Sequence, residues 1–60
     1  MNKVNQMRNY LKYLLIENDA QIEIIGQGES LVQEEADFSF ERMGHSYFVS
    51  ITDVSHRKPS

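Results

Sequence analysis

Residues 17–41 read ENDAQIEIIGQGESLVQEEADFSFE, and this segment decides how the chain folds. Its second and third residues are Asn18 and Asp19, whose short side chains compete for backbone hydrogen bonds and favour the end of a helix. Behind that pair, apolar and polar residues alternate in two stretches, as strands require. The segment also holds eight carboxylates and no Lys or Arg, whereas the charged residues on either side of it are mainly basic.

Three strands are expected in and after this segment. Residues 20–25 alternate with period two, which predicts a strand with one buried face. Residues 26–28, Gly-Gln-Gly, are expected to break that strand, since glycine permits a positive φ and a change of direction. Residues 37–41 and 46–53 predict the second and third strands, joined by a hairpin loop in which Gly44 takes the positive φ.

Residues 30–36 are compatible with two local structures. Ser30 and the residues after it resemble a capping box and could start one helical turn. Alternatively, Val32 and Ala36 share the parity of Phe38, which would fit one long bent strand. Glu34 interrupts that parity, so a bulge or a short turn is expected in the middle.

Upstream of the acidic segment, residues 2–16 predict an amphipathic helix that stops at Asn18-Asp19. Its apolar side chains recur at spacings of three and four, which places them on one stripe. The stripe consists of Val4, Met7, Leu11, Leu14 and Leu15, and the opposite, solvent-facing side of Asn5, Arg8, Asn9 and Lys12.

These elements predict an α+β fold. One N-terminal amphipathic helix packs on one face of a small, mostly antiparallel three-stranded sheet, in the order α-β-β-β. Residues 1–54 are expected to form a single domain and residues 55–60 a mobile C-terminal tail.

Length and composition favour self-association. A 60-residue chain buries only about 60% of the surface that it exposes when unfolded, and the absence of cysteine excludes disulfide staples. A homodimer is expected, with Ile25, Phe48 and Val54 as the apolar residues of its interface on the sheet face away from the helix. The apolar run at residues 14–16 is far shorter than a membrane span of about 20 residues, so a cytoplasmic location is expected.

The acidic residues predict a non-enzymatic protein-interaction module. Carboxylates gathered without cations raise a negative potential that attracts basic partners, so the chain is expected to bind and modulate another protein. A phage- or plasmid-type inhibitor, or a DNA mimic, is the narrower form of this hypothesis and rests on charge and size alone. The opposing interpretation is a solvated face that blocks edge-to-edge aggregation. The residues expected to bind are Glu23, Glu34, Glu35, Asp37 and Glu41.

A small nucleic-acid-binding regulator is the alternative. It would use the basic helix side, Arg8 and Lys12, together with Arg57 and Lys58 of the tail. Affinity for nucleic acid comes from neutralising phosphates, which takes several clustered cations. Two cations in each group and a net charge of −3 disfavour this interpretation.

No catalytic, metal or cofactor site is predicted. The two histidines, His45 and His56, occur in no metal-binding motif, and no serine has a base and an orienting acid in a recognisable pattern. Gly26-Gln27-Gly28 lacks the Lys and the further glycines of a phosphate-binding loop. An enzyme is therefore not expected, and neither a cofactor nor a metal is.

Overall fold

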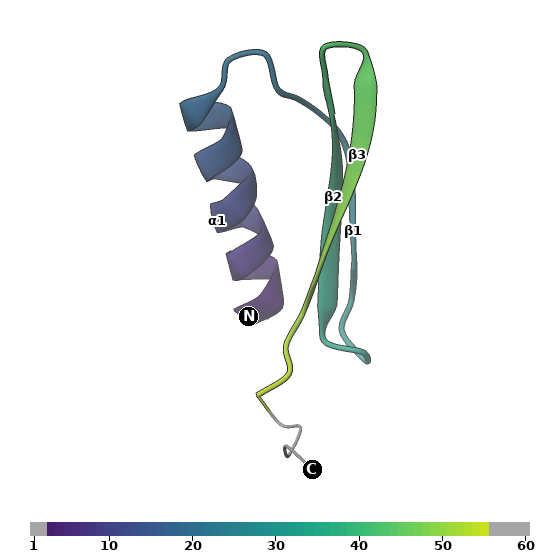
Figure 1. The fold of residues 1–60 in the computed structure, drawn as a ribbon. Coiled ribbons are helices and arrows are strands. Elements are labelled where there is room, and N and C mark those ends of the chain that lie inside the picture. The colour runs from purple at the N-terminus through teal and green to yellow at the C-terminus, as the bar shows by residue number, and fades with distance from the viewer. Residues whose placement is uncertain (1–2, 56–60) are drawn as a thin grey trace.

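The computed structural model describes residues 3–55 of the chain. Helix α1 spans Lys3–Asn18, followed by strands β1 (Glu23–Ser30), β2 (Glu35–Arg42) and β3 (His45–Thr52). The strands form one antiparallel sheet in the order β1-β2-β3, and α1 lies against one of its faces (Figure 1). The predicted α-β-β-β order of an α+β fold is confirmed. Of the tail expected at residues 55–60, only Ser55 falls within the described residues.

Helix α1 ends at Asn18, where the sequence predicted its end. The Asn18 side-chain amide donates to the Leu14 carbonyl at 2.7 Å, and the Asp19 backbone N–H donates to the Leu15 carbonyl at 3.0 Å. The Asp19 carboxylate then accepts the Gln21 backbone N–H at 3.0 Å. These short polar side chains satisfy backbone groups that the next helical turn would otherwise use.

The helix is rotated about its axis relative to the predicted stripe. Val4 and Arg8 are its buried residues, whereas Met7 and Leu14 keep 48% and 38% of their surface exposed. The prediction that Arg8 lies on the solvent side is wrong, since its side chain is only 3% exposed. The spacing of residues along the helix does not show that the Arg8 guanidinium has hydrogen-bond acceptors on another element. Those acceptors lie on β1.

Strand β1 continues through both glycines, so the predicted break after Ile25 is wrong. Neither Gly26 nor Gly28 has a positive φ, and the chain continues in extended form. The pairing with β2 shifts between Ile24 and Gly26, which makes Ile25 the extra residue of a β-bulge. Beyond the bulge the faces are exchanged, because side chains alternate with period two.

Two hairpins connect the strands. Residues 31–34 form the turn between β1 and β2, so the ambiguous residues 30–36 are divided among a strand end, a turn and a strand start. Glu34 closes this turn with φ 53°. The β2–β3 hairpin has a two-residue loop, in which Met43 and Gly44 have φ of 53° and 81°. The predicted positive φ at Gly44 is confirmed.

The core is thin and centred on β2. Among the described residues, only Val4, Ala36 and Phe38 are buried apolar residues. The Phe40 ring lies 6.1 Å from that of Phe38 and 5.2 Å from that of Tyr47, which gives an aromatic row on the helix side of the sheet. Because α1 covers one face only, the opposite face of the sheet is left open (Figure 1).

Candidate functional site

The strand register gathers four carboxylates on the open face of the sheet. Buried Ala36 and Phe38 face the helix, so the alternate residues of β2 project from the other side. Glu23 of β1 lies directly opposite Glu41 and therefore shares its face. We call the open-face carboxylates Glu23, Glu35, Asp37 and Glu41 the acidic face.

Small residues flank two carboxylates of the central strand, Glu35 and Asp37. Asp37 lies between Gly28 of β1 and Ser50 of β3. Glu35 lies between Ser30 and Thr52, and the Thr52 hydroxyl donates to its carboxylate at 3.3 Å. Because Glu35 and Asp37 have short neighbours on both sides, the side chains of another molecule can approach these two carboxylates directly.

Gly26 and Gly28 leave room for the open-face side chains. A Cβ added at Gly28 would lie 3.1 Å from Oδ1 of Asp37, and one at Gly26 would lie 3.3 Å from the Ser39 hydroxyl. Because neither glycine has a positive φ, the close approach explains their presence better than backbone conformation does. The glycines that were predicted to break the strand instead make space beside Asp37 and Ser39.

The cations of the described residues lie away from the acidic face. Lys3, Arg8 and Lys12 belong to α1, and Arg42 of β2 has the parity of the helix side. Arg42 forms an ion pair with Asp19 in the α1–β1 connection. The hydrogen bond from Arg42, supported by the one from the Gln21 backbone, lowers the pKa of Asp19 below its ordinary value of 3.8.

Glu34 does not belong to the acidic face. It lies in the β1–β2 turn, where its backbone carbonyl accepts the Asp53 N–H at 3.1 Å. Four of the five residues predicted to bind a partner therefore share one face, and the fifth lies in the turn at its end. Glu29 faces the helix, because the bulge exchanges the two faces for the residues of β1 that follow it.

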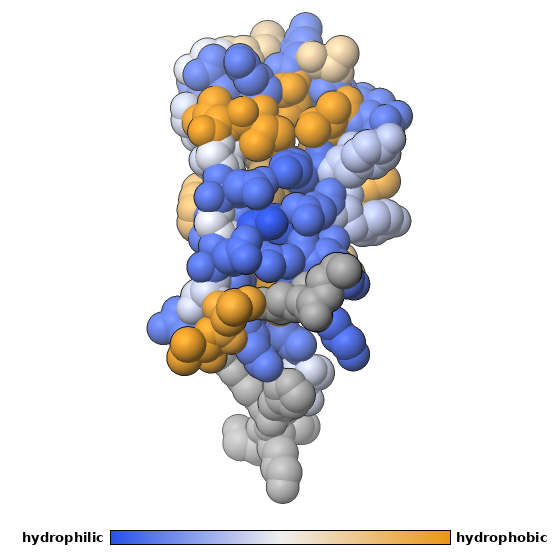
Figure 2. All heavy atoms as spheres, turned by 180° about the vertical axis from the view of Figure 1, so that it is seen from behind, coloured by the Kyte–Doolittle hydropathy of each residue, from blue (hydrophilic) through white to orange (hydrophobic). Residues whose placement is uncertain are grey.

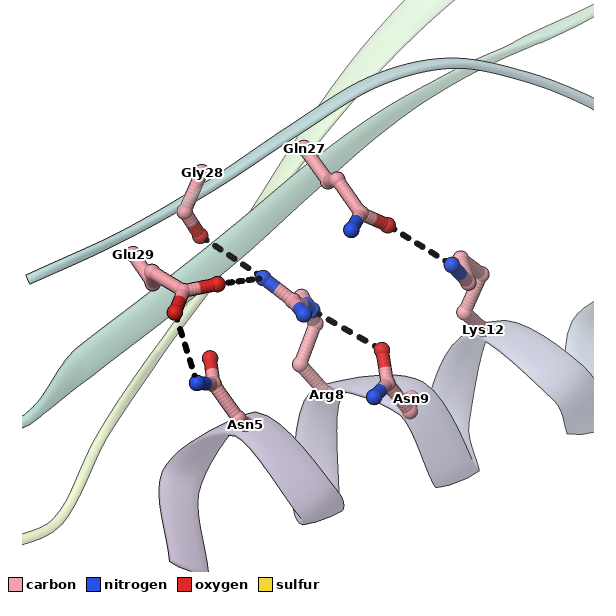
Figure 3. Close-up of polar contacts among 7 residues, drawn as sticks. All are labelled: Asn5, Arg8, Asn9, Lys12, Gln27, Gly28 and Glu29. Carbon is pink, nitrogen blue, oxygen red and sulfur yellow. Dashed lines mark hydrogen bonds and ion pairs between the residues drawn. The ribbon is translucent and has the colours of Figure 1, made fainter. Parts of the chain in front are cut away.

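Arg8 belongs to a polar contact between α1 and β1, which we call the α1–β1 seam (Figure 3). Its Nη1 donates to the Gly28 carbonyl at 2.9 Å and lies 3.4 Å from Oε1 of Glu29. The Asn5 amide donates to the other Glu29 oxygen at 2.8 Å. The seam thus joins the first half of the helix to the second half of β1.

Lys12 extends the seam by one helical turn. Its Nζ donates to Oε1 of Gln27 at 2.7 Å. Figure 2, which views the molecule from the β1 side, shows a hydrophilic band between hydrophobic groups above and below. Arg8 and Lys12, the two helix cations that the nucleic-acid hypothesis requires, both donate hydrogen bonds to β1 within the molecule. Arg57 and Lys58, which complete that hypothesis, lie outside the described residues.

The three residues predicted as a dimer face are not gathered into one patch. Phe48 lies opposite Ser39 on the open face and is 69% exposed. Ile25 is the extra residue of the bulge on the far edge strand. Val54 follows β3 and lines a hollow with Val4 and Met7 on the helix side of the sheet.

The seam was missed by sequence reasoning, although one signal for it was present. Two glycines inside a strand-like pattern often mark a bulge or a close backbone approach. A bulge at Ile25 exchanges the faces of the following residues, so Gln27 and Glu29 would be expected to face the helix. Arg8 and Lys12 are four residues apart on that helix, so their side chains could then reach acceptors on Glu29 and Gln27.

Within residues 3–55, no group of three or more His, Asp or Glu side chains is placed to hold a metal ion. The described helix is too short and too polar to cross a membrane. Comparison with protein-family models, with curated proteins and with solved structures finds no match.

Proposed function

We propose that this chain is a protein-interaction module that binds a basic surface of another protein through the acidic face. One observation carries the proposal: the strand register places Glu23, Glu35, Asp37 and Glu41 on the sheet face that α1 leaves open. A partner with clustered Lys or Arg side chains would complement the negative potential of this face.

The arrangement of these charges opposes stability, which supports a role in binding. Glu23 and Glu41 are directly opposite each other on neighbouring strands, and like charges so placed are destabilising. A surface that serves solubility alone normally intersperses both signs. Among the described residues, none of the four carboxylates forms an ion pair with a Lys or Arg, whereas Asp19 and Glu29 on the helix side do.

The charge of the acidic face indicates the class of partner protein that it would bind. A protein that binds nucleic acid presents a basic groove, so an inhibitor or DNA mimic remains the narrower form of this proposal. The competing interpretation, a nucleic-acid-binding regulator, loses support because Arg8 is buried and Lys12 is hydrogen-bonded to Gln27. We retain the cytoplasm as the proposed compartment, on the sequence argument that the apolar run at residues 14–16 is far shorter than a membrane span.

The proposal is tested by capturing partners from a lysate of the native host with matched variants. D37N/E41Q removes two charges from the acidic face and changes the net charge from −3 to −1. E17K makes the same change in net charge at an exposed helix position away from that face. We expect E17K to retain a salt-sensitive partner that D37N/E41Q loses. Equal capture by wild type and D37N/E41Q would refute the proposal.

The alternative is tested by a gel-shift assay with mixed oligonucleotides at low salt. Non-specific binders reach Kd values of about 10⁻⁴ to 10⁻⁶ M, so a shift below about 100 μM is the signature of that function. We expect no shift. A shift that disappears in R57A/K58A would favour the nucleic-acid regulator instead.

A further inference from the structure

Strand β3 is an edge strand that lacks the usual protection against pairing. Its sequence, His45–Thr52, contains no Lys, Arg, Asp, Glu, Gly or Pro. Natural edge strands avoid pairing with other chains by means of charges, prolines or bulges. In the described part of the chain β3 is paired along its whole length with β2, and no strand pairs with its outer edge.

The opposite edge of the sheet is protected. Strand β1 carries the bulge at Ile25, two glycines, and the charged residues Glu23 and Glu29. A bulge twists an edge away from a regular partner, and charges penalise pairing of identical strands. The two edges of one small sheet thus differ in this respect, and β3 is the one suited to accept another strand.

The helix side of β3 is also incompletely covered. One apolar hollow, of about 330 Å³, lies among Leu11, Leu14 and Val49, and a second, of about 370 Å³, lies among Val4, Met7 and Ile51. Both hollows lie between α1 and β3. A chain with three buried apolar residues in its described part has much to gain from covering them.

We propose that a second copy of this chain binds at β3, so that two β3 strands pair antiparallel about a twofold axis. The result is a six-stranded sheet with both helices on one face and both acidic faces on the other. The apolar hollows of the two copies then adjoin across the axis and can be closed together. This interface differs from the set Ile25, Phe48 and Val54, because it uses the strand edge rather than the open face.

The geometry of antiparallel pairing restricts the axis to one of two residues. In an antiparallel pair, two directly opposed residues project to the same face of the sheet. The twofold axis must therefore lie between one residue of β3 and the same residue of the second copy. Phe48 and Val49 are the two residues nearest the centre of β3. With the axis at Val49, Tyr47 lies opposite Ile51 of the second copy. With the axis at Phe48, Tyr47 lies opposite Val49. Both registers bring Tyr47, Val49 and Ile51 of the two copies together on the helix side, with His45 at the end of this row.

Weaker repulsion between like charges favours this pairing over one through β1. The two β2 strands would be three strand spacings apart, about 14 Å, which exceeds the Debye length of about 8 Å at physiological ionic strength. Asp37 and Glu41 of one copy are therefore repelled only weakly by the same residues of the other copy. Pairing through β1 would bring the charged residues Glu23 and Glu29 of two copies together on adjacent strands.

The first test is sedimentation of the full chain at micromolar concentrations, with two matched variants. S50K adds a cation at the centre of the β3 edge, and S30K adds one on the same sheet face at the β1 edge. We expect a mass near twice 7.0 kDa for wild type and S30K, and a dimer Kd at least about tenfold higher for S50K. A monomeric wild type, or equal effects of both substitutions, would overturn the proposal.

The second test uses the absence of cysteine in the chain. A cysteine on the axis meets its own copy at a Cα separation of about 4.5–5.5 Å, which a disulfide can bridge. We expect F48C or V49C to form a covalent dimer with oxidised glutathione, and S30C to stay monomeric. Cross-linking only at position 30, or at none of the three, contradicts β3 pairing. These readouts measure self-association and not capture of a basic partner, so they succeed or fail independently of the proposed function.

Discussion

Replacement of Arg8 tests whether the α1–β1 seam holds the helix on the sheet. The guanidinium donates to the Gly28 carbonyl at 2.9 Å, and the side chain is 3% exposed. R8A removes the charge and the aliphatic stem together. R8M removes the charge but keeps an apolar chain of similar length in the same space. The comparison therefore separates packing from hydrogen bonding.

The expected magnitudes follow from three contributions. A hydrogen bond from a charged donor to the Gly28 carbonyl contributes about 1.5–3 kcal/mol. R8A keeps Cβ and so loses the burial of two stem methylenes, which contributes about 1.6 kcal/mol at about 0.8 kcal/mol each. The ion pair with Glu29 contributes under about 1 kcal/mol, because that carboxylate is 45% exposed and screened by solvent.

We expect R8A to lower the free energy of unfolding by about 3–5.5 kcal/mol and R8M by about 1.5–4 kcal/mol. E29Q should lower it by less than about 1 kcal/mol. Domains of 60 residues have a total stability of about 3–9 kcal/mol, so R8A is expected to remove a large share of the stability of the fold.

Urea unfolding followed by circular dichroism measures these changes, and tyrosine fluorescence provides a second probe because the chain has no Trp. Because unfolding of a dimer depends on concentration, all variants are compared at one protein concentration. A loss below about 1 kcal/mol for R8A would refute the seam as a structural element. An E29Q effect as large as that of R8A would show that the ion pair dominates, contrary to the reasoning from exposure.

Three further predictions concern turns and charges. M43N should raise the free energy of unfolding by about 0.5–1 kcal/mol in urea titrations, because Met43 has φ 53° and Asn tolerates that conformation better. E41Q should raise it by about 0.2–1 kcal/mol by relieving repulsion from Glu23, and a loss of stability would contradict the register argument. The lowered pKa of Asp19 means that its ion pair with Arg42 stabilises the fold above pH 3.8 and is lost as the pH falls through the lower, folded-state pKa. D19N should therefore lose less stability than wild type in acid titrations below that pH.

Local chemistry was sufficient to predict the number and order of the elements, but not the bounds of β1, which was expected at residues 20–25 and spans Glu23–Ser30. The Asn18-Asp19 pair predicted the end of the helix, and Gly44 predicted the hairpin between β2 and β3. The alternation of Asp37 and Glu41 with Phe38 and Phe40 predicted which side of β2 faces solvent. These features depend on residues within one or two turns of the chain, where propensity and periodicity act directly.

Tertiary structure decided the features that depend on the pairing of distant residues. The bulge at Ile25 arises from the register between β1 and β2, and it moves Glu29 to the helix side without any change in local alternation. Arg8 resembles a solvent-facing residue in a helical pattern until that register supplies Gly28 and Glu29 as its acceptors. The sequence by itself determined which side chains are apolar and can form a core, and which are charged. The register determined which of them meet, because a shift of one residue in a strand exchanges its two faces.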